Sequence, residues 1–287
     1  MASQTPVWLI IGASSGFGQI IAKEALKRNQ HVIAASRRPE AMADLKEAGA
    51  AVLAIDVTSD EKTLAEKVKE AVSVHGYITH VVNAVGYALG GANESIDDEL
   101  ALQQFRTNVL GTMKMTRLTT PYLREQKFGV IVNFGSVGSW TGCPGMSHYA
   151  ASKWAVSGFS ESMTDELAAF GIKVICIEPG YFRTGFLNSG HVVWAPNRMQ
   201  EEYKGTPAEE YRELAAQYNN NQPGDVNKAG PLIVDVLTKT GASKERDIPM
   251  RLILGSDCSA DVEKKAKSTL ALMEEWKDIS LATDYDN

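Results

Sequence analysis

The stretch "IIGASSGFGQII" (residues 10–21) connects an apolar run to the first turns of a predicted helix. Its glycines, Gly12, Gly16 and Gly18, allow a tight turn after the first strand and let a pyrophosphate approach the backbone over a helix N-terminus. The spacing differs from the G-x-G-x-x-G fingerprint, so a purely structural turn is the alternative. We interpret the stretch as a candidate dinucleotide-binding loop.

The same residues also match G-x-S-x-G, the nucleophile elbow of α/β-hydrolases, with Ser14 as the nucleophile. In those enzymes an earlier strand is followed by a loop that donates part of the oxyanion hole. Only eleven residues precede Gly12 in this sequence, so no upstream loop can supply that donor. A phosphate-binding loop is therefore favoured over a serine nucleophile.

The composition is typical of a folded globular protein. The 287 residues are 44% hydrophobic and carry a formal net charge of −6, without a basic cluster of the kind that binds nucleic acid or anionic membranes. No apolar run approaches the roughly 20 residues of a membrane span, and the N-terminal segment lacks a basic signal-peptide region, so we expect a cytoplasmic protein. Three widely spaced cysteines and five histidines predict neither disulfides nor a metal site.

Short β-branched runs alternate with helical patterns along the chain. Several runs are apolar at consecutive positions, as in strands buried on both faces of a parallel sheet. Thr58 and Glu61 form a candidate capping box ahead of one helix. The repeated unit predicts one α/β domain over residues 1–287, a doubly wound parallel sheet with helices on both faces. The predicted strands are residues 7–11, 31–35, 51–57, 78–85, 129–135 and 172–180.

Two arginines follow the second predicted strand, where the adenosine of a dinucleotide would lie. A NAD-selective site places a carboxylate in this zone to bind the ribose 2′-hydroxyl. Arg37 and Arg38 stand there instead, and guanidinium groups can bind a 2′-phosphate bidentately. The sequence therefore predicts NADP(H) as the cofactor, with a solvated basic turn as the alternative.

A tyrosine and a lysine, Tyr149 and Lys153, are four residues apart, so on one helix they share a face and lie one turn apart. We expect the ammonium group, together with an oxidised nicotinamide ring, to lower the tyrosine pKa from about 10 toward neutrality. Tyr149 would then be a usable general acid and base.

Further landmarks are "FRTNVLG" around Asn108, "NFGSVG" around Ser136, "YAASK" from Tyr149 and "PGYFRT" from Pro179. In order and spacing they resemble the short-chain dehydrogenase/reductase family, which has a Rossmann fold, from about Val7 to Thr184. The resemblance implies that Ser136 binds the substrate carbonyl oxygen and that Tyr149 transfers the proton. Lys153 would orient the ribose and tune the tyrosine, and Asn108 would hold a relay water.

The same resemblance implies a set of cofactor-binding residues. Asp56 would meet the adenine and Thr184 the nicotinamide carboxamide. One departure is "NAVG" (residues 83–86), where Ala84 replaces a second Asn that the family usually has, so that contact with the sheet or cofactor differs there. The implied set is Gly12, Ser14, Ser15, Gly16, Phe17, Gly18, Arg37, Arg38, Asp56, Val57, Asn83, Gly86, Tyr149, Lys153, Pro179, Gly180, Phe182 and Thr184.

Each of these residues also has a structural alternative. Asn108 could make a polar helix contact, Ser136 could form a turn at a strand end, and Asp56 could precede a helix. The joint spacing of the set favours the functional interpretation.

The region 181–224 has the least regular pattern, and long irregular segments in compact domains are commonly lids. We expect it to cap an apolar substrate pocket for a hydrophobic carbonyl or alcohol, including cyclic compounds. Cys143 has no visible activating partner and is interpreted as pocket wall. Ordinary core packing is the alternative for all the side chains that we expect in this pocket. The predicted pocket residues are Tyr87, Cys143, Met146, Tyr181 and Trp194, with Trp140 beside them.

The segments "GSVG", "EPGYFRTGF" and "MRLILGSD" are most similar to the branch that contains 17-beta-hydroxysteroid and retinol dehydrogenases. Together with Arg37 and Arg38, the family resemblance predicts an NADP(H)-dependent carbonyl reductase, and the cysteine and histidine pattern predicts no metal. The resemblance also suggests a homodimer or homotetramer formed through the helices after Asp97 and Tyr149, although a monomer stays open. A cofactor-binding protein of the same fold with a non-redox or scaffolding role is the alternative.

Overall fold

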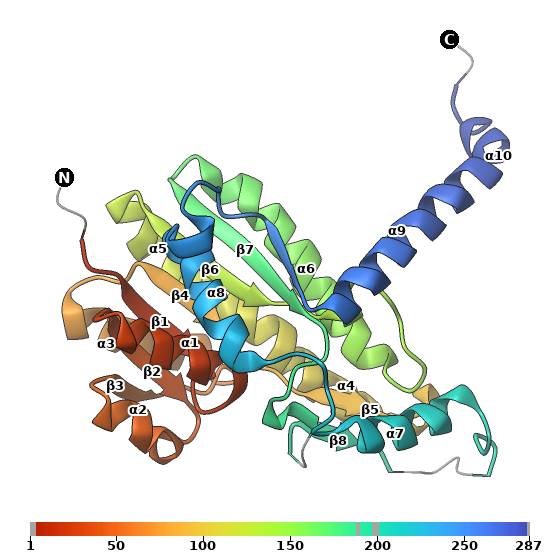
Figure 1. Ribbon diagram of the computed structural model, residues 1–287, viewed down its shortest axis with the longest axis horizontal. Coiled ribbons are helices and arrows are strands. Elements are labelled where there is room, and N and C mark those ends of the chain that lie inside the picture. The colour runs from red at the N-terminus through yellow and green to blue at the C-terminus, as the bar shows by residue number, and fades with distance from the viewer. Residues whose placement is uncertain (1–3, 188–189, 197–200, 286–287) are drawn as a thin grey trace.

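A seven-stranded parallel sheet forms the centre of the computed structural model, which describes residues 4–187, 190–196 and 201–285 (Figure 1). Its strand order is β3-β2-β1-β4-β6-β7-β9. A separate two-stranded sheet pairs β5 with β8. The strands are β1 (Val7–Ile11), β2 (His31–Ser36), β3 (Ala51–Ala54), β4 (His80–Asn83), β5 (Ala88–Gly90), β6 (Gly129–Phe134), β7 (Ile172–Pro179), β8 (Val192–Trp194) and β9 (Arg251–Leu254).

Helices cover both faces of the sheet, which confirms the predicted doubly wound fold. The main helices are α1 (Gly16–Lys27), α2 (Ala43–Glu47), α3 (Glu61–His75), α4 (Asp98–Phe105), α5 (Thr112–Gln126), α6 (Ser147–Ala168), α7 (Pro207–Tyr218), α8 (Val226–Thr238), α9 (Ser256–Glu275) and α10 (Lys277–Leu281).

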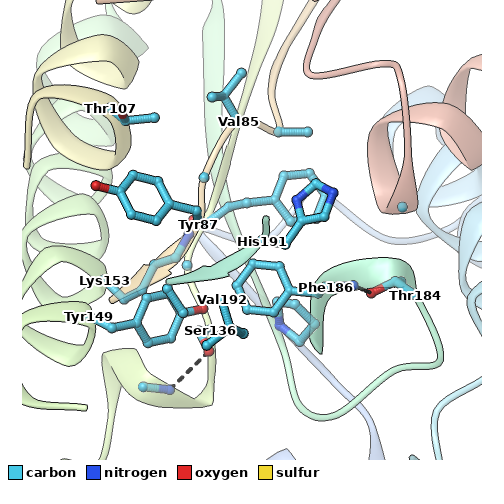
Figure 2. A pocket seen from close by; sticks show the side chains of 18 of the residues that line it. Val85, Tyr87, Thr107, Ser136, Tyr149, Lys153, Thr184, Phe186, His191 and Val192 are labelled. Carbon is cyan, nitrogen blue, oxygen red and sulfur yellow. Dashed lines mark hydrogen bonds between the residues drawn. The ribbon is translucent and has the colours of Figure 1, made fainter. Parts of the chain in front are cut away.

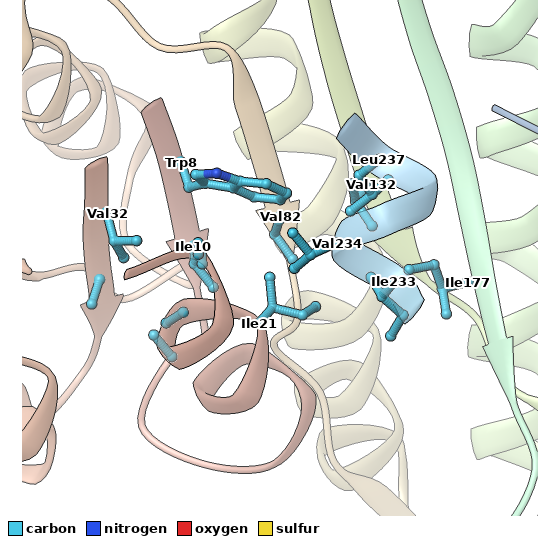
Figure 3. Packing of buried hydrophobic residues seen from close by; sticks show 14 of the residues in the cluster. Trp8, Ile10, Ile21, Val32, Val82, Val132, Ile177, Ile233, Val234 and Leu237 are labelled. Atoms are coloured by element: carbon cyan, nitrogen blue, oxygen red, sulfur yellow. The ribbon is translucent and has the colours of Figure 1, made fainter. Parts of the chain in front are cut away.

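Alternation along β1 divides the core into two layers, because successive side chains of a strand point to opposite faces. Ile10 packs with Ile21 of α1 and Ile233 of α8 in one layer (Figure 3). Leu9 packs in the other layer with apolar side chains of α3, α5 and α6, among them Met115. Since both faces are buried, consecutive positions of β1 are all apolar.

The order of the strands reverses direction at the centre of the sheet. From β1 the chain moves outward to β2 and β3, and then returns to β4 on the other side of β1. In such sheets the crevice at the carboxyl ends of the two central strands is the usual ligand site. The loops after β1 and β4 are therefore placed to form one.

All six predicted strands are present, with some differences in extent. β3 ends at Ala54 rather than residue 57, because the chain turns at Asp56, whose carboxylate accepts from the backbone N and the hydroxyl of Thr58. The edge strand β9 and the small β5–β8 sheet were not predicted.

Two local expectations are wrong. The capping box at Thr58 and Glu61 does not form: Asp60 caps α3 and accepts a hydrogen bond of 2.9 Å from the backbone N of Thr63. The region 181–224 is also more regular than expected, because it contains β8 and the three-turn helix α7.

The described residues contain neither a candidate membrane span nor a candidate metal site. No helix in this part of the chain is both long and apolar enough to cross a membrane. No three His, Cys, Asp or Glu side chains within the same residues are grouped as metal ligands.

A buried histidine ties β4 to its neighbours. The His80 ring stacks on Trp8 with centroids 4.1 Å apart, and its ring nitrogens bond the Thr79 hydroxyl and the Leu237 carbonyl. Burial lowers the His80 pKa to about 4 from an ordinary 6.5. The unfolded chain therefore binds more protons than the folded chain between those pH values.

We expect this histidine to lower the free energy of unfolding as the pH falls from 6.5 toward 4. Between pH 7 and pH 5, His80 alone should lower the free energy of unfolding by about 2 kcal/mol. Urea unfolding at several pH values measures the slope for the wild type and for His80→Phe. The slope should be shallower in the variant, and equal slopes would contradict the assignment.

Candidate active site

A cavity of about 1230 Å³ lies over the carboxyl ends of the strands (Figure 2). Loops that follow β1, β2, β3, β4, β6 and β7 all contribute to its wall. The crevice between β1 and β4 is thus continuous with the space above α6. One site can therefore hold both an extended ligand and a smaller molecule beside it.

The loop after β1 depends on two close backbone contacts. Gly12 has φ +90°, and a Cβ there would lie 2.7 Å from the backbone of Ala84. A Cβ on Gly18 would lie 2.3 Å from the Gly12 carbonyl oxygen, so α1 starts directly against the turn. Only glycine permits this packing.

The N-terminus of α1 is open toward the cavity. Ser15 is its N-cap but makes no side-chain capping hydrogen bond, and the first turn has no acidic residue. By contrast, α3 and α8 are capped by the carboxylates of Asp60 and Asp225. Uncapped amides at a helix N-terminus favour an anion.

Arginine side chains border the cavity next to this helix. Arg37 and Arg38 are exposed and line the cavity after β2. Among the described residues, no carboxylate pairs with either guanidinium. Asp56 lies across from them after β3, with one oxygen already bonded to Thr58. The charge of both arginines is therefore available to a ligand.

The helix α6 brings Tyr149 and Lys153 to the cavity. The Lys153 ammonium donates to the Phe134 carbonyl oxygen at 2.8 Å and lies 5.8 Å from the centroid of the Tyr149 ring. The other side of that ring faces Phe186, at a centroid distance of 6.0 Å (Figure 2). The tyrosine is thus held between the lysine and the segment after β7.

Ser136 lies at the end of β6, beside the tyrosine (Figure 2). It caps the 3-10 turn η4 (Val137–Ser139), and its hydroxyl accepts from the Gly138 backbone N at 3.1 Å. Ser139 in the same turn donates to the Lys153 carbonyl at 3.0 Å. The turn therefore fixes the serine relative to α6.

Asn108 sits in a π-helical turn, η3 (Arg106–Gly111), between α4 and α5. Its amide bonds both backbone groups of Tyr87, at 2.9 and 3.1 Å, and donates to the Ser152 hydroxyl at 3.1 Å. Such turns widen a helix locally and are frequent at functional sites. The asparagine thereby fixes the loop after β4 to α6.

Burial is the largest influence on the pKa values of Tyr149 and Lys153. It raises the pKa of Tyr149 to about 12, although the Ser136 hydroxyl opposes the shift. It lowers the pKa of Lys153 to about 8. The expected depression of the Tyr149 pKa is therefore not found in the protein alone, because desolvation by burial outweighs the hydrogen bond to Ser136.

Most predicted site residues line this cavity. Of the predicted cofactor residues these are Gly12, Ser14, Ser15, Gly16, Phe17, Arg37, Arg38, Asp56, Val57, Gly86, Tyr149, Lys153, Pro179, Gly180, Phe182 and Thr184. Ser136 and the predicted substrate residues Tyr87, Cys143, Met146 and Tyr181 line it too. Asn108 and Gly18 lie directly behind the wall, where they support Tyr87 and Gly12.

Three residues that were expected to line the cavity do not line it. The Trp194 ring packs over Gly90, where a Cβ would lie 2.5 Å from it, and borders a separate small cavity. Trp140 turns toward Glu178 and donates its indole N–H at 2.7 Å. Asn83 is 3% exposed, and its amide donates to Asn133 at 2.9 Å, which links β4 to β6.

Several lining residues were not predicted from the sequence. Phe186, His191 and Tyr211 lie in the region 181–224, and the Tyr211 hydroxyl is 3.2 Å from the Tyr181 hydroxyl. Polar residues of α9, from Asp261 to Ser268, also line the cavity. The aromatic content of 181–224 was a signal for the first group, but the sequence has none for the second.

The buried ammonium of Lys153 should reduce the stability of the fold. A displacement of its pKa from 10.5 to about 8 disfavours folding by about 3 kcal/mol at neutral pH, and its hydrogen bond to Phe134 offsets part of this. We expect Lys153→Met to raise the free energy of unfolding by about 1 kcal/mol and Tm by about 3 °C at pH 7. Calorimetry measures both.

The pH dependence provides the control. Because the folded pKa lies below the unfolded one, the wild type gains stability as the pH rises from about 8 to 10.5. The advantage of Lys153→Met should shrink over that range. A constant difference would contradict the assignment.

Comparison with known proteins agrees with this arrangement. The family model "short chain dehydrogenase" matches residues 6–191. Oxidoreductase BOA17 of Botryotinia fuckeliana is 34% identical over 97% of this chain and 99% of its own. Retinol dehydrogenase 16 of Rattus norvegicus is 34% identical over 62% of this chain and 57% of its own.

This chain is also similar to a solved structure of a short-chain dehydrogenase. A short-chain dehydrogenase from Streptomyces avermitilis is 33% identical, with a TM-score of 0.87 over 98% of this chain and 100% of its own. The chain belongs to the short-chain dehydrogenase family, an oxidoreductase family.

Proposed function

We propose that this protein is an NADP(H)-dependent oxidoreductase that interconverts a carbonyl group and a secondary alcohol on a hydrophobic small molecule, cyclic compounds included. One observation carries the proposal. Tyr149, Lys153 and Ser136 share a single cavity with the uncapped N-terminus of α1 and the arginines after β2. Acid–base groups and an anion-binding surface thus lie in one site.

The residues present fit a dinucleotide. The open first turn of α1, next to Gly12, would hold the pyrophosphate. Arg37 and Arg38 would bind a 2′-phosphate, and Asp56 would lie near the adenine. Bound NADPH supplies the hydride.

The side chains of the protein would then bind the substrate oxygen and donate a proton to it. Ser136 is fixed by η4 and would hold the carbonyl oxygen. Tyr149 would donate the proton from its hydroxyl, which is protonated at neutral pH because burial raises its pKa. Lys153 would hold the ribose and stabilise the resulting phenolate by its charge. Asn108 would position a relay water between the lysine and bulk solvent.

The substrate end of the cavity is mostly apolar and aromatic. Phe186 and Val192 face Tyr149 across it, and Met146 and Tyr181 complete the wall (Figure 2). Such a wall favours a hydrophobic substrate, as does the retinol named for one relative. The region 181–224 would act as the lid of this pocket within the single domain.

Replacing the tyrosine tests the chemistry. We expect Tyr149→Phe to reduce kcat for ketone reduction by about 10²–10⁴-fold, the usual contribution of a general acid. NADPH binding, measured by fluorescence titration, should stay close to that of the wild type. The control Tyr203→Phe, at a half-buried lid tyrosine whose hydroxyl donates to Glu94, should keep its turnover. A Tyr149→Phe enzyme with a near-normal rate would rule out this mechanism.

Replacing an arginine tests the choice of cofactor. Arg37→Asp should weaken NADPH binding by about tenfold or more, because a charge-assisted bond is lost and a like charge is introduced. NADH binding should weaken less or improve. Arg117→Asp, at an exposed position on α5, serves as the control. Equal affinity of the unchanged protein for NADH and NADPH would contradict the predicted selectivity.

A carbonyl-compound panel separates the proposal from the alternatives. NADPH binding without turnover of any ketone or aldehyde would favour a non-redox role for the same fold. A hydrolase with Ser14 as nucleophile has little support, because among the described residues no histidine hydrogen-bonds that serine.

A further inference from the structure

Three polar side chains meet at the substrate end of the cavity. Tyr181 follows β7, Tyr211 belongs to α7, and Cys143 precedes α6. The two tyrosine hydroxyls are 3.2 Å apart, and the Cys143 thiol is close enough to hydrogen-bond the Tyr211 hydroxyl. All three side chains line the cavity. We call these three residues the phenol–thiol cluster.

Backbone contacts fix the phenol–thiol cluster in place. The backbone N of Tyr181 donates to the Asp257 carboxylate at 2.7 Å, at the start of α9. A Cβ on Gly145 would lie 3.2 Å from the Ala208 carbonyl oxygen, so the loop that carries Cys143 packs directly against α7. Three segments that are distant in sequence thus hold the cluster together.

The cluster has more hydrogen-bond donors than its internal contacts use. Two phenols and one thiol supply three protons, and two contacts join them, Tyr181 with Tyr211 and Tyr211 with Cys143. Each contact uses one proton. Across residues 4–187, 190–196 and 201–285, these three side chains make no further hydrogen bond. One proton and several lone pairs therefore remain for a ligand.

The protonation of the cluster favours a neutral ligand. Burial raises the pKa of Tyr181, of Tyr211 and of Cys143, so all three groups keep their protons at neutral pH. The carboxylate of Asp261 raises the pKa of Cys143 and of Tyr181 further. A negative charge beside the cluster disfavours an anion. A hydroxyl group suits the site, because it is neutral and both donates and accepts.

We propose that the phenol–thiol cluster binds a hydroxyl group of the substrate, while Ser136 and Tyr149 bind its carbonyl. This inference rests on the proposed function and names its substrate class: apolar ketones that carry a hydroxyl group apart from the carbonyl. Tyr181 is near enough to Tyr149 to affect its pKa, so one small molecule can reach both.

The surroundings of the cluster make the position of that hydroxyl important. Apolar side chains, among them Met146 and Phe186, form the wall near these polar groups. A hydroxyl placed against an apolar wall loses its hydrogen bonds to water without replacement. Only a hydroxyl that reaches the cluster recovers them, so the site should distinguish positional isomers.

Matched ketones test the inference. The probes are 1-tetralone, an apolar bicyclic ketone, and its ring-hydroxylated isomers, each reduced with NADPH. We expect the wild type to favour at least one isomer over 1-tetralone by about tenfold in kcat/KM, because that isomer gains a buried hydrogen bond. Equal values for all of these ketones would overturn the proposal. Preference for a ring-carboxylated tetralone would also overturn it and assign this end to Lys264 and Lys265, which line the cavity from α9.

Removal of single hydroxyls tests the residues. Tyr211→Phe keeps the ring, and its ratio of kcat/KM between the preferred isomer and 1-tetralone should fall toward one. Tyr181→Phe should act in the same way, and the double variant should add little, because the two hydroxyls act as a pair. The control Tyr218→Phe, at a 41% exposed ring that packs against Tyr181, should keep the wild-type ratio. An unchanged ratio in both Tyr211→Phe and Tyr181→Phe would overturn the proposal.

Calorimetric titration separates this inference from the proposed function. The protein, with and without NADP⁺, is titrated with 1-tetralone and with each hydroxylated isomer, so the readout does not depend on turnover. Tighter binding of one isomer that is lost in Tyr211→Phe would support the cluster, and absence of turnover would then overturn only the proposed function. Reduction of ketones without an effect of the hydroxyl in either assay would overturn the cluster and leave the proposed function intact.

Discussion

Hydrogen bonds between α6 and the sheet determine where the reactive groups stand. The buried face of α6 is rich in serine, and these hydroxyls meet fixed partners: Ser157 donates to the Glu178 carboxylate at 2.7 Å, and Ser160 accepts from Asn133 at 2.9 Å. The Lys153 ammonium adds a third bond at the end of β6. Apolar packing alone tolerates small shifts of a helix, whereas buried polar groups must keep their partners. The register of Tyr149 over the cavity follows from this.

Two features of the cavity lower the stability of the protein when no ligand is bound. α1 starts without a side-chain cap, although α3 and α8 both have one. A cap typically contributes about 1 kcal/mol, so its absence has a cost in the protein alone. Lys153 is buried and has no carboxylate partner within the described part of the chain, which adds to that cost. Binding sites commonly retain such unfavourable features because the ligand satisfies them.

A single helix connects the substrate cavity with the outer surface. The base of α9 supplies cavity wall on its polar face, and exposed apolar side chains follow farther along the helix, among them Leu270 and Met273. The 3-10 turn η4 touches α9 on one side and positions Ser136 on the other.

The sequence by itself determined the features that arise from neighbours along the chain. Consecutive apolar runs specified the central strands, glycines specified the turn before α1, and the four-residue spacing specified that Tyr149 and Lys153 share a helix face. These depend on backbone geometry and local periodicity. The family resemblance added the order of the landmarks, and most of the residues that it implied do line one cavity.

Only the tertiary structure decided features in which distant segments meet. Trp194 and Trp140 are aromatic, as expected of pocket residues, but the close approach of Gly90 and the acceptor on Glu178 direct them elsewhere. The contribution of α9 to the cavity has no local signal, because it depends on where β9 ends. The high pKa of Tyr149 likewise comes from burial by elements far apart in sequence, since desolvation is a property of the assembled site.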